Sequence, residues 1–505
     1  MVTRVGTGPR QRAQPAPARW KGSRVNFCRD VVEAASPDRL ALVERRRDGG
    51  RATWTFGQLG DRSARLAGTL QTSFGVRGGD VVLLMIGARV EWVEAMLAGF
   101  RLGAVVLPVS EQLRPADLRH RLTAVQPAAI LADERHRAVL ETAAPACPVA
   151  LLPDQRLYAA EPAGSADLAP TDPCLMTFTS GTAAVPKPVL HAQRYLLGQR
   201  LQAEHWLGAR DGDLVWCTAS PGWSKSARNV FLAPWLRGAA ALLHDARFDP
   251  AERLAVLAEE SVDVLCMAPT EYRVLARQAA LPRLPAIHSL VAAGEALDPP
   301  TLRAWRDAVG VDIRDGYGQT ETGQLTGNRV GRPARPGSMG PLLPGIRAWI
   351  DGGELVVDAA SVPTFFLGYA GSAPPSGPWR TGDAVRMDDE GYLWFSGRTD
   401  DVINSAGYRI GPAEVESVLA HHPAVADSAV VAAPDAERGS VVRAVVVLRA
   451  GFTPSALLAR ELQEHVKAET APYKYPRIVD FVADLPRTST GKTRRAALRE
   501  PSPDG

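Results

Sequence analysis

The chain has 505 residues, of which 46% are hydrophobic and 22% are charged, a composition typical of an ordinary globular protein. Because so long a chain does not pack around one hydrophobic core, we expect two or more domains. The formal net charge of +3 is close to neutral for this length, which argues against a protein dedicated to binding nucleic acid or acidic membrane surfaces.

The cysteines and the N-terminal segment indicate a cytoplasmic protein. The 5 cysteines are odd in number and far apart, and none belongs to a Cys-x-x-Cys pair. This spacing argues against a disulfide framework or a structural zinc site and fits a reducing compartment. Residues 1–24 are rich in Gly, Pro and Arg and lack an apolar core segment, so we expect a disordered tail rather than a signal peptide.

Strand and helix patterns alternate through the first 300 residues. In the most apolar region we expect a strand at 81–86, a helix and a second strand at 104–109. Charged residues interrupt this region, so it does not predict a membrane span. The expected helix carries one apolar stripe, formed by Val90, Val93, Leu97 and Phe100. Further strands are expected at 129–131, 214–217, 240–244, 262–268 and 290–293. The alternation predicts an α/β fold in which helices cover largely parallel sheets.

The pattern changes twice in the last third of the chain. Short strands with frequent turns, at 347–350, 354–357 and 392–395, predict a small β-rich subdomain. Beyond Asp400, a helix at 412–420, strands at 425–432 and 441–448 and a helix at 455–469 predict an α+β unit. We therefore expect a large N-terminal domain of residues 25–399 and a small C-terminal domain of residues 400–505.

The segment from Thr177 to His191 predicts a strand that runs into a phosphate-binding loop, with a helix that begins near His191. Its sequence is Thr-Phe-Thr-Ser-Gly-Thr-Ala-Ala-Val-Pro-Lys-Pro-Val-Leu-His. The hydroxyl groups of Thr179, Ser180 and Thr182 and the backbone at Gly181 are suited to hold an anion, and Lys187 adds a cation. The order is not Gly-x4-Gly-Lys-Ser/Thr, so an ordinary P-loop NTPase is not predicted.

Later segments carry further groups that suit a nucleotide. Tyr317 stands between two glycines and offers a stacking face, and Glu321 follows it as a candidate ligand for a divalent cation. The carboxylate of Asp383 can accept both hydroxyls of a ribose, and Arg398 can reach a ribose or a phosphate. Each segment alone is also compatible with a polar turn or a structural ion pair. Their order after the Ser/Thr/Gly loop makes chance a poor explanation.

These segments resemble the adenylate-forming superfamily, which includes acyl-CoA synthetases, luciferases and the adenylation domains of peptide synthetases. The runs at 397–416 and 485–492 resemble its hinge and catalytic-lysine segments, and the resemblance covers about residues 26–498. The amino-acid sequences at 315–323 and 405–412 are most similar to those of the medium-chain acyl-CoA synthetases. The phosphate loop is degenerate, because Ala183, Ala184 and Pro188 stand where the family has Thr, Gly and Gly.

The resemblance implies a role for individual residues. Lys492 would neutralise charge on the carboxylate and α-phosphate, Thr320 would touch the adenylate phosphate and Glu321 would hold Mg²⁺. Asp400 would be the hinge of a mobile C-terminal domain. The CoA tunnel would be flanked by Gly407 and Arg409. The residues implied to surround the adenine and ribose of the adenylate are Gly294, Glu295, Asp315, Gly316, Tyr317, Asp383 and Arg398.

Substrate size is indicated by small residues at the implied acyl pocket. Synthetases for acetate place Trp where this chain has Gly318, and Ala292 and Ala293 are also small. These residues imply an acid larger than acetate. Trp223 and Lys225 resemble a pocket-lining stretch, although a core Trp beside a surface Lys fits the pattern nearly as well.

The family joins two half-reactions, and the phosphate loop serves the first of them alone. Pro188 has no backbone N–H, and Ala183 and Ala184 replace residues suited to holding the β- and γ-phosphates. We therefore expect intact thioester formation from an acyl-adenylate and CoA, with weak adenylation by ATP and Mg²⁺, so that a separate adenylating enzyme would supply the adenylate. Two alternatives stay open: a fully competent two-step synthetase, and a stand-alone adenylation domain that loads a carrier-protein thiol.

Overall fold

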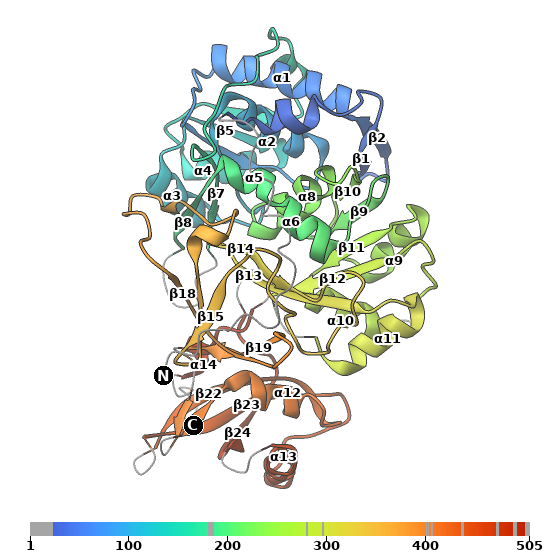
Figure 1. Ribbon diagram of the computed structural model, residues 1–505, viewed down its shortest axis with the longest axis vertical. Coiled ribbons are helices and arrows are strands. Elements are labelled where there is room, and N and C mark those ends of the chain that lie inside the picture. The colour runs from blue at the N-terminus through green and yellow to red at the C-terminus, as the bar shows by residue number, and fades with distance from the viewer. Residues whose placement is uncertain are drawn as a thin grey trace.

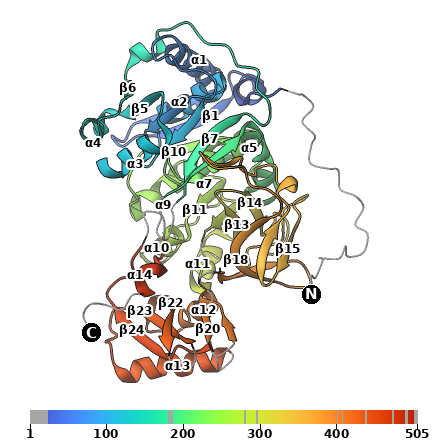
Figure 2. The same ribbon diagram turned by 90° about the vertical axis from the view of Figure 1, so that its left-hand side faces the viewer.

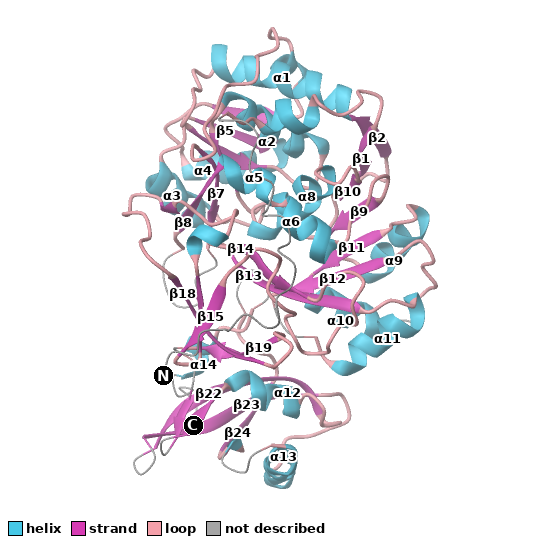
Figure 3. Ribbon diagram, in the orientation of Figure 1, coloured by secondary structure: helices cyan, strands magenta, loops and turns pink. Residues whose placement is uncertain are grey.

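The computed structural model describes residues 24–179, 186–278, 281–294, 297–399, 401, 403–405, 408–435, 439–470, 474–487 and 492–499. Two large sheets and their helices fill one end of the long axis, and a separate C-terminal unit lies at the other (Figures 1 and 2). A smaller sheet lies between these ends (Figure 3). Nearly all of the expected tail lies outside the described residues.

The first large sheet has seven strands in the order β17-β8-β7-β4-β3-β5-β6. The strands from β7 to β6 are parallel, whereas β8 and β17 add to the edge in antiparallel fashion. The strands are β3 (Val81–Met85), β4 (Val105–Pro108), β5 (Ala129–Asp133), β6 (Val149–Leu152), β7 (Pro173–Phe178), β8 (Pro188–Ala192) and β17 (Gly368–Tyr369). The helices in the same stretch of chain are α1 (Phe56–Thr72), α2 (Val90–Leu102), α3 (Pro115–Val125), α4 (Arg137–Ala143) and α5 (Gln193–Gly198).

The second large sheet has eight strands in the order β14-β13-β12-β11-β9-β10-β1-β2. Its inner strands are parallel and its two edge pairs are antiparallel. The strands are β1 (Leu40–Arg45), β2 (Arg51–Thr55), β9 (Leu214–Cys217), β10 (Ala240–His244), β11 (Val264–Met267), β12 (Ser289–Ala293), β13 (Ile313–Gln319) and β14 (Gly323–Gly327). The helices are α6 (Arg200–Gln202), α7 (Ser224–Ala227), α8 (Ala233–Trp235), α9 (Pro250–Glu259), α10 (Pro269–Gln278) and α11 (Pro299–Val309). Short π-helical and 3₁₀ turns span Cys28–Val32, Glu134–His136, Gln155–Tyr158, Ala203–Leu207, Arg228–Leu232 and Ala359–Ser361.

Helix α2 is buried on nearly all sides, and not only on the one apolar stripe that the sequence predicted. Twelve of its 13 residues are buried, including Glu94 and Arg101. The helix packs in the core shared by the two large sheets, so it has no face left for water. The carboxylate of Glu94 is neutralised there by Arg62 and accepts a hydrogen bond from the Tyr158 hydroxyl at 2.5 Å. The predicted stripe of Val90, Val93, Leu97 and Phe100 is buried, and the rest of the helix is buried with it.

The last third of the chain forms two smaller units. A four-stranded antiparallel sheet contains β15 (Ala348–Asp351), β16 (Glu354–Val357), β18 (Trp379–Met387) and β19 (Leu393–Arg398). The C-terminal unit has its own core. It contains β20 (Ile403–Ser405), β21 (Tyr408–Ile410), α12 (Pro412–Leu419), β22 (Val425–Asp435), β23 (Gly439–Leu448), α13 (Ala456–Glu469), β24 (Ile478–Val482) and α14 (Arg495–Arg499).

The predicted α/β class is confirmed, with antiparallel strands at the edges of largely parallel sheets. The helix expected near His191 begins at Gln193, but the sequence did not predict strand β8, which comes between the phosphate loop and this helix. Residues 188–192 form a strand because they pair with β7, and His191 lies opposite Leu175 in that ladder. Among the described residues, no helix is both long and apolar enough to cross a bilayer.

Trp305 is a fully buried member of the second core, which lies between the eight-stranded sheet and helices α9 to α11. This residue is 0% exposed, its Nε1 donates to the carbonyl of Tyr272 at 3.1 Å, and its ring meets that of Tyr272 edge to face. We expect Trp305→Ala to lower the free energy of unfolding by about 3–5 kcal/mol, because it leaves a large cavity. Urea unfolding followed by circular dichroism measures this loss. The matched change in half-buried Trp394 should cost clearly less, and equal losses would contradict this view of the core.

Candidate active site

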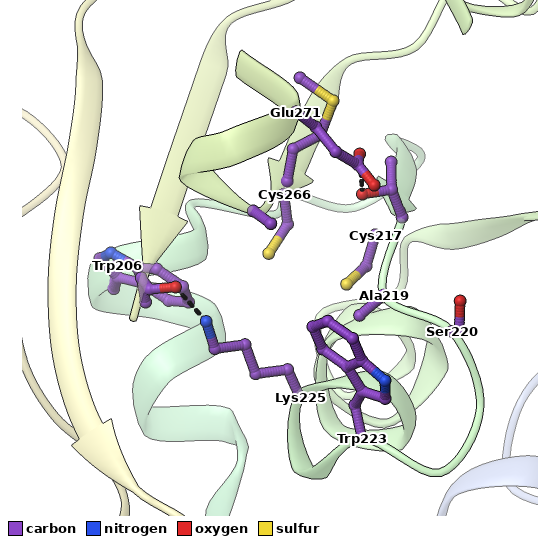
Figure 4. Close-up of a pocket in the computed structure, with 12 residues that line it drawn as sticks. Trp206, Cys217, Ala219, Ser220, Trp223, Lys225, Cys266 and Glu271 are labelled. Carbon is purple, nitrogen blue, oxygen red and sulfur yellow. Dashed lines mark hydrogen bonds between the residues drawn. The ribbon is translucent and has the colours of Figure 1, made fainter. Parts of the chain in front are cut away.

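A pocket opens where the carboxyl ends of β9, β11 and β12 meet (Figure 4). This edge of a parallel sheet is where α/β folds commonly hold ligands. The cavity has a volume of about 120 Å³. Its lining residues are Trp206, Cys217, Thr218, Ala219, Ser220, Trp223, Lys225, Cys266, Met267, Ala268, Glu271 and Ala293.

Lys225 places a cation in this pocket. Its ammonium group donates a hydrogen bond to the carbonyl oxygen of Ala293 (Figure 4). Burial, followed by the positive charges of Lys492 and Arg228, lowers the pKa of Lys225 to about 8. The effect of Lys492 puts the charge of the C-terminal unit within electrostatic reach of the pocket.

The backbone beside Lys225 is adapted to a close approach. Gly294 follows β12 with φ at +114°, a conformation that side chains rarely adopt, and a Cβ there would lie 2.7 Å from the ammonium nitrogen of Lys225. On the neighbouring strand β13, Asp315 accepts a hydrogen bond from the N–H of Gly316 at 2.8 Å. Burial raises the pKa of Asp315 to about 7, while the charges of Lys225 and Arg273 act in the opposite direction.

Asp383 is the centre of a hydrogen-bond network that joins β13 to the four-stranded sheet. Its side chain is buried, and Arg398, its partner in the β18–β19 ladder, donates to Oδ1 at 3.0 Å. Oδ2 accepts hydrogen bonds from the Tyr317 hydroxyl and from Gln319 Nε2, the latter at 2.7 Å. Burial and the charge of Asp383 raise the pKa of Tyr317 well above its ordinary value. Three residues that the resemblance assigned to the adenylate thus lie in direct contact.

A second chain of contacts joins the stem of the phosphate loop to Glu321. Thr179 and Lys187 lie opposite each other, since the Thr179 N–H donates to the Lys187 carbonyl at 3.0 Å. The Lys187 ammonium lies 5.2 Å from the centre of the Tyr369 ring, and the Tyr369 hydroxyl donates to Glu321 Oε1 at 2.9 Å. Glu321 and Thr320 occupy the turn between β13 and β14.

Two predicted pocket residues lie elsewhere. Ala292 packs in the second core, because it points to the opposite face of β12 from Ala293. Gly318 is not among the lining residues, and a Cβ there would collide with the carbonyl oxygen of Gly323. Its small size therefore has a local reason in the close approach of β14. Trp223 and Ala293 do line the pocket, and Trp223 is not a core residue.

Some predicted site residues lie outside the described residues. They are Ser180, Gly181, Thr182, Ala183 and Ala184 of the loop, together with Glu295, Asp400 and Gly407. Arg409 lies in β21, where it pairs with Asn404, but its side chain is outside the description. Lys492 is described and exposed.

The sequence did not predict several residues of the site. Glu271 and Thr218 share a hydrogen bond at the pocket wall but come from different elements, so no local pattern joins them. Gln319 and Tyr369 connect predicted residues through contacts between distant segments. A polar residue at the start of a helix directly after a buried strand was the one available signal for Glu271.

Comparison with known proteins identifies the family. The model of AMP-binding enzymes matches residues 30–360, and the model of the AMP-binding enzyme C-terminal domain matches residues 414–492. The mitochondrial acyl-coenzyme A synthetase ACSM4 of Rattus norvegicus is 37% identical over 523 residues, which cover 94% of this chain and 90% of that protein.

Two solved structures have the same fold over nearly the whole chain. A benzoate CoA ligase from Burkholderia xenovorans LB400 has a TM-score of 0.84 and 28% identity, covering 94% of this chain and 100% of that one. ATP-bound MatB from Rhodopseudomonas palustris has a TM-score of 0.82 and 26% identity, with coverages of 94% and 98%. The chain therefore belongs to the AMP-binding enzyme family, as one of its AMP-forming acyl-CoA synthetases.

Proposed function

We propose that this enzyme converts a carboxylic acid larger than acetate into its CoA thioester through an acyl-adenylate. The observation that carries the proposal is the pocket that holds the ammonium group of Lys225, where the charge of Lys492 also acts. A carboxylic acid in this pocket would have its carboxyl group beside the positive charges of Lys225 and Lys492. Free cysteines suit a reducing compartment, so we further propose that the enzyme acts in the cytoplasm.

The nucleotide would bind next to the pocket, along β13 and the four-stranded sheet. Asp383 and Arg398 would hold the ribose, with Tyr317, Gly316, Asp315, Gly294 and Glu295 around the adenine. Asp383 already accepts from Tyr317, Gln319 and Arg398, so ribose hydroxyls would share or replace those bonds. Glu321 has an oxygen-donor side chain near the loop stem, which fits the ligands that Mg²⁺ prefers.

The first half-reaction would require attack of the carboxylate oxygen on the α-phosphorus of ATP, with release of pyrophosphate. Lys492 and Lys225 would lower the repulsion between the carboxylate and the phosphate oxygens, and Thr320 would donate to the phosphate. In the second half-reaction the CoA sulfur would bond to the acyl carbon and AMP would leave. We propose that the C-terminal unit turns about Asp400 between the two, bringing Gly407 and Arg409 to the CoA.

The size of the acid follows from the pocket wall. Ala293 leaves room beside Trp223 and Trp206, and the cavity volume exceeds what an acetyl group fills. The benzoate ligase that shares the fold takes, by its name, a ring-bearing acid. Because Gly318 is needed for the contact with β14, the proposed size of the acid depends on the small side chain of Ala293.

We also propose that adenylation is the slower half-reaction, so that an adenylate supplied by a separate enzyme would be used readily. Ala183 and Ala184 lack the hydroxyl and the flexible backbone that the family's loop has at these positions. Pro188 contributes less than the sequence suggested, since a strand can begin with Pro and its carbonyl accepts from Ala370 at 2.8 Å.

The pocket lysine predicts how the reaction depends on pH. With a pKa of about 8, Lys225 is charged at pH 7 and is only about one-tenth protonated at pH 9. We therefore expect the KM for the acid to rise up to about tenfold from pH 7 to pH 9, measured by AMP release. Lys225→Arg should remove this dependence, because Arg stays protonated. A wild-type KM that is constant over this range would contradict the role of Lys225.

The loop predicts that adenylation can be improved. Ala183→Thr combined with Ala184→Gly should raise ATP-dependent pyrophosphate release about tenfold or more, as expected for a regained hydrogen bond to a phosphate. Thioester formation from preformed adenylate and CoA should stay unchanged. The control Pro188→Gly should alter either rate less than about twofold. Fast pyrophosphate release by the wild type, with no gain in the double variant, would exclude an impaired loop.

A further inference from the structure

We propose that the pocket selects a ring-bearing carboxylic acid that carries a hydroxyl or amino group, and that Glu271 accepts a hydrogen bond from that group. This inference rests on the proposed function and names the class of acid. Glu271 stands in the first turn of α10, directly after β11, at the opposite side of the pocket from Lys225 (Figure 4).

The surroundings of Glu271 are unfavourable for a carboxylate. Its neighbours in the wall include Cys217, Cys266, Met267 and Ala268, which offer little to solvate a negative charge. Burial raises the pKa of Glu271 above its ordinary value, and the charge of Arg253 and the Thr218 hydrogen bond only partly oppose this. A carboxylate in such a place is stabilised by each additional hydrogen-bond donor.

The two oxygens of Glu271 are not equally satisfied. Oε2 accepts from the Thr218 hydroxyl at 2.6 Å. Oε1 lies 3.7 Å from Arg253 Nη2, which is too far for a hydrogen bond. The guanidinium of Arg253 is held 4.8 Å from the centre of the Trp216 ring. Among the residues that the structure describes, Thr218 and Arg253 are the polar partners of this carboxylate, which leaves acceptor capacity at the pocket wall.

The position of Glu271 fixes which end of the acid it would meet. Lys225 and Gly294 mark the carboxyl end, because the charge of Lys492 reaches Lys225. Glu271 lies across the pocket, beyond the sulfur atoms of Cys217 and Cys266 (Figure 4). Trp206 and Trp223 border the space between these ends, and indole rings pack well against another ring.

Selectivity between acids follows from the chemical group that each acid would place beside Glu271. A hydroxyl or amino group would complete the hydrogen bonding of the carboxylate. A methyl group of similar size would cover the carboxylate without a donor, and a site built for a donor rejects such an analogue strongly. Glu271 also has a structural role, because it supports the first turn of α10 and Arg253. That role does not distinguish between the two acids.

The test compares two unreactive adenylate analogues, the sulfamoyl adenosines of aminobenzoate and methylbenzoate, each as the 3- and 4-isomer. Calorimetry gives the Kd of each analogue for the wild type, for Glu271→Met and for the control Glu252→Gln. Glu252 lies on the outer helix α9 and contacts His244. We expect the wild type and the control to bind the amino analogue at least about tenfold more tightly at one ring position. Glu271→Met should reverse this preference.

The inference is overturned if the wild type binds both analogues equally, or if the preference survives in Glu271→Met. In either case, thioester formation from preformed benzoyl-adenylate and CoA would still proceed, so the proposed function would stand. Absence of binding by every analogue, together with no thioester from any preformed adenylate, would instead reject the proposed function and this inference with it.

Discussion

The buried carboxylate of Asp383 holds the active-site region together. It receives hydrogen bonds from β13 of the eight-stranded sheet and from Arg398 at the end of β19, two segments that no local pattern connects. Burying one carboxylate among three donors is favourable only while all of them stay in place, so the network fixes the position of Tyr317 and Gln319. Arg398 is also the last strand residue before the proposed hinge at Asp400. The same interaction thus joins the proposed nucleotide site to the strand that leads to the C-terminal unit.

The pocket itself carries an excess of positive charge. Lys225 lines it, and Arg228 lies close behind with 3% exposure and with its Nε and Nη1 lacking a hydrogen-bond partner in the described part of the chain. The pKa of Lys225 is lowered first by burial and then by the positive charges of Lys492 and Arg228, so these cations repel one another. An anionic acid and a phosphate would relieve this repulsion, so we infer that the charges at the pocket favour anionic ligands. Glu271 on the far wall balances part of the charge without contacting either cation.

Much of this arrangement could be predicted from the sequence, because local patterns carry it. Strands β9, β10 and β16 have the bounds that their apolar runs predicted, and the motifs around Tyr317 and Asp383 identified the family. The features that the sequence did not predict have a common physical origin in contacts between distant segments. Helix α2 is buried by two sheets at once, and β8 is a strand because β7 pairs with it. Gly318 is small because β14 passes over it, and Glu271 reaches the pocket only through the packing of α10.

We propose that an acid held at Lys225 reacts with the α-phosphate of a nucleotide held at Asp383. The most direct measurement follows oxygen atoms from an acid labelled with ¹⁸O in its carboxyl group, incubated with ATP, Mg²⁺ and CoA. We expect one labelled oxygen to appear in AMP for each thioester formed, and none to appear in pyrophosphate. Thioester formation that leaves AMP unlabelled would contradict it.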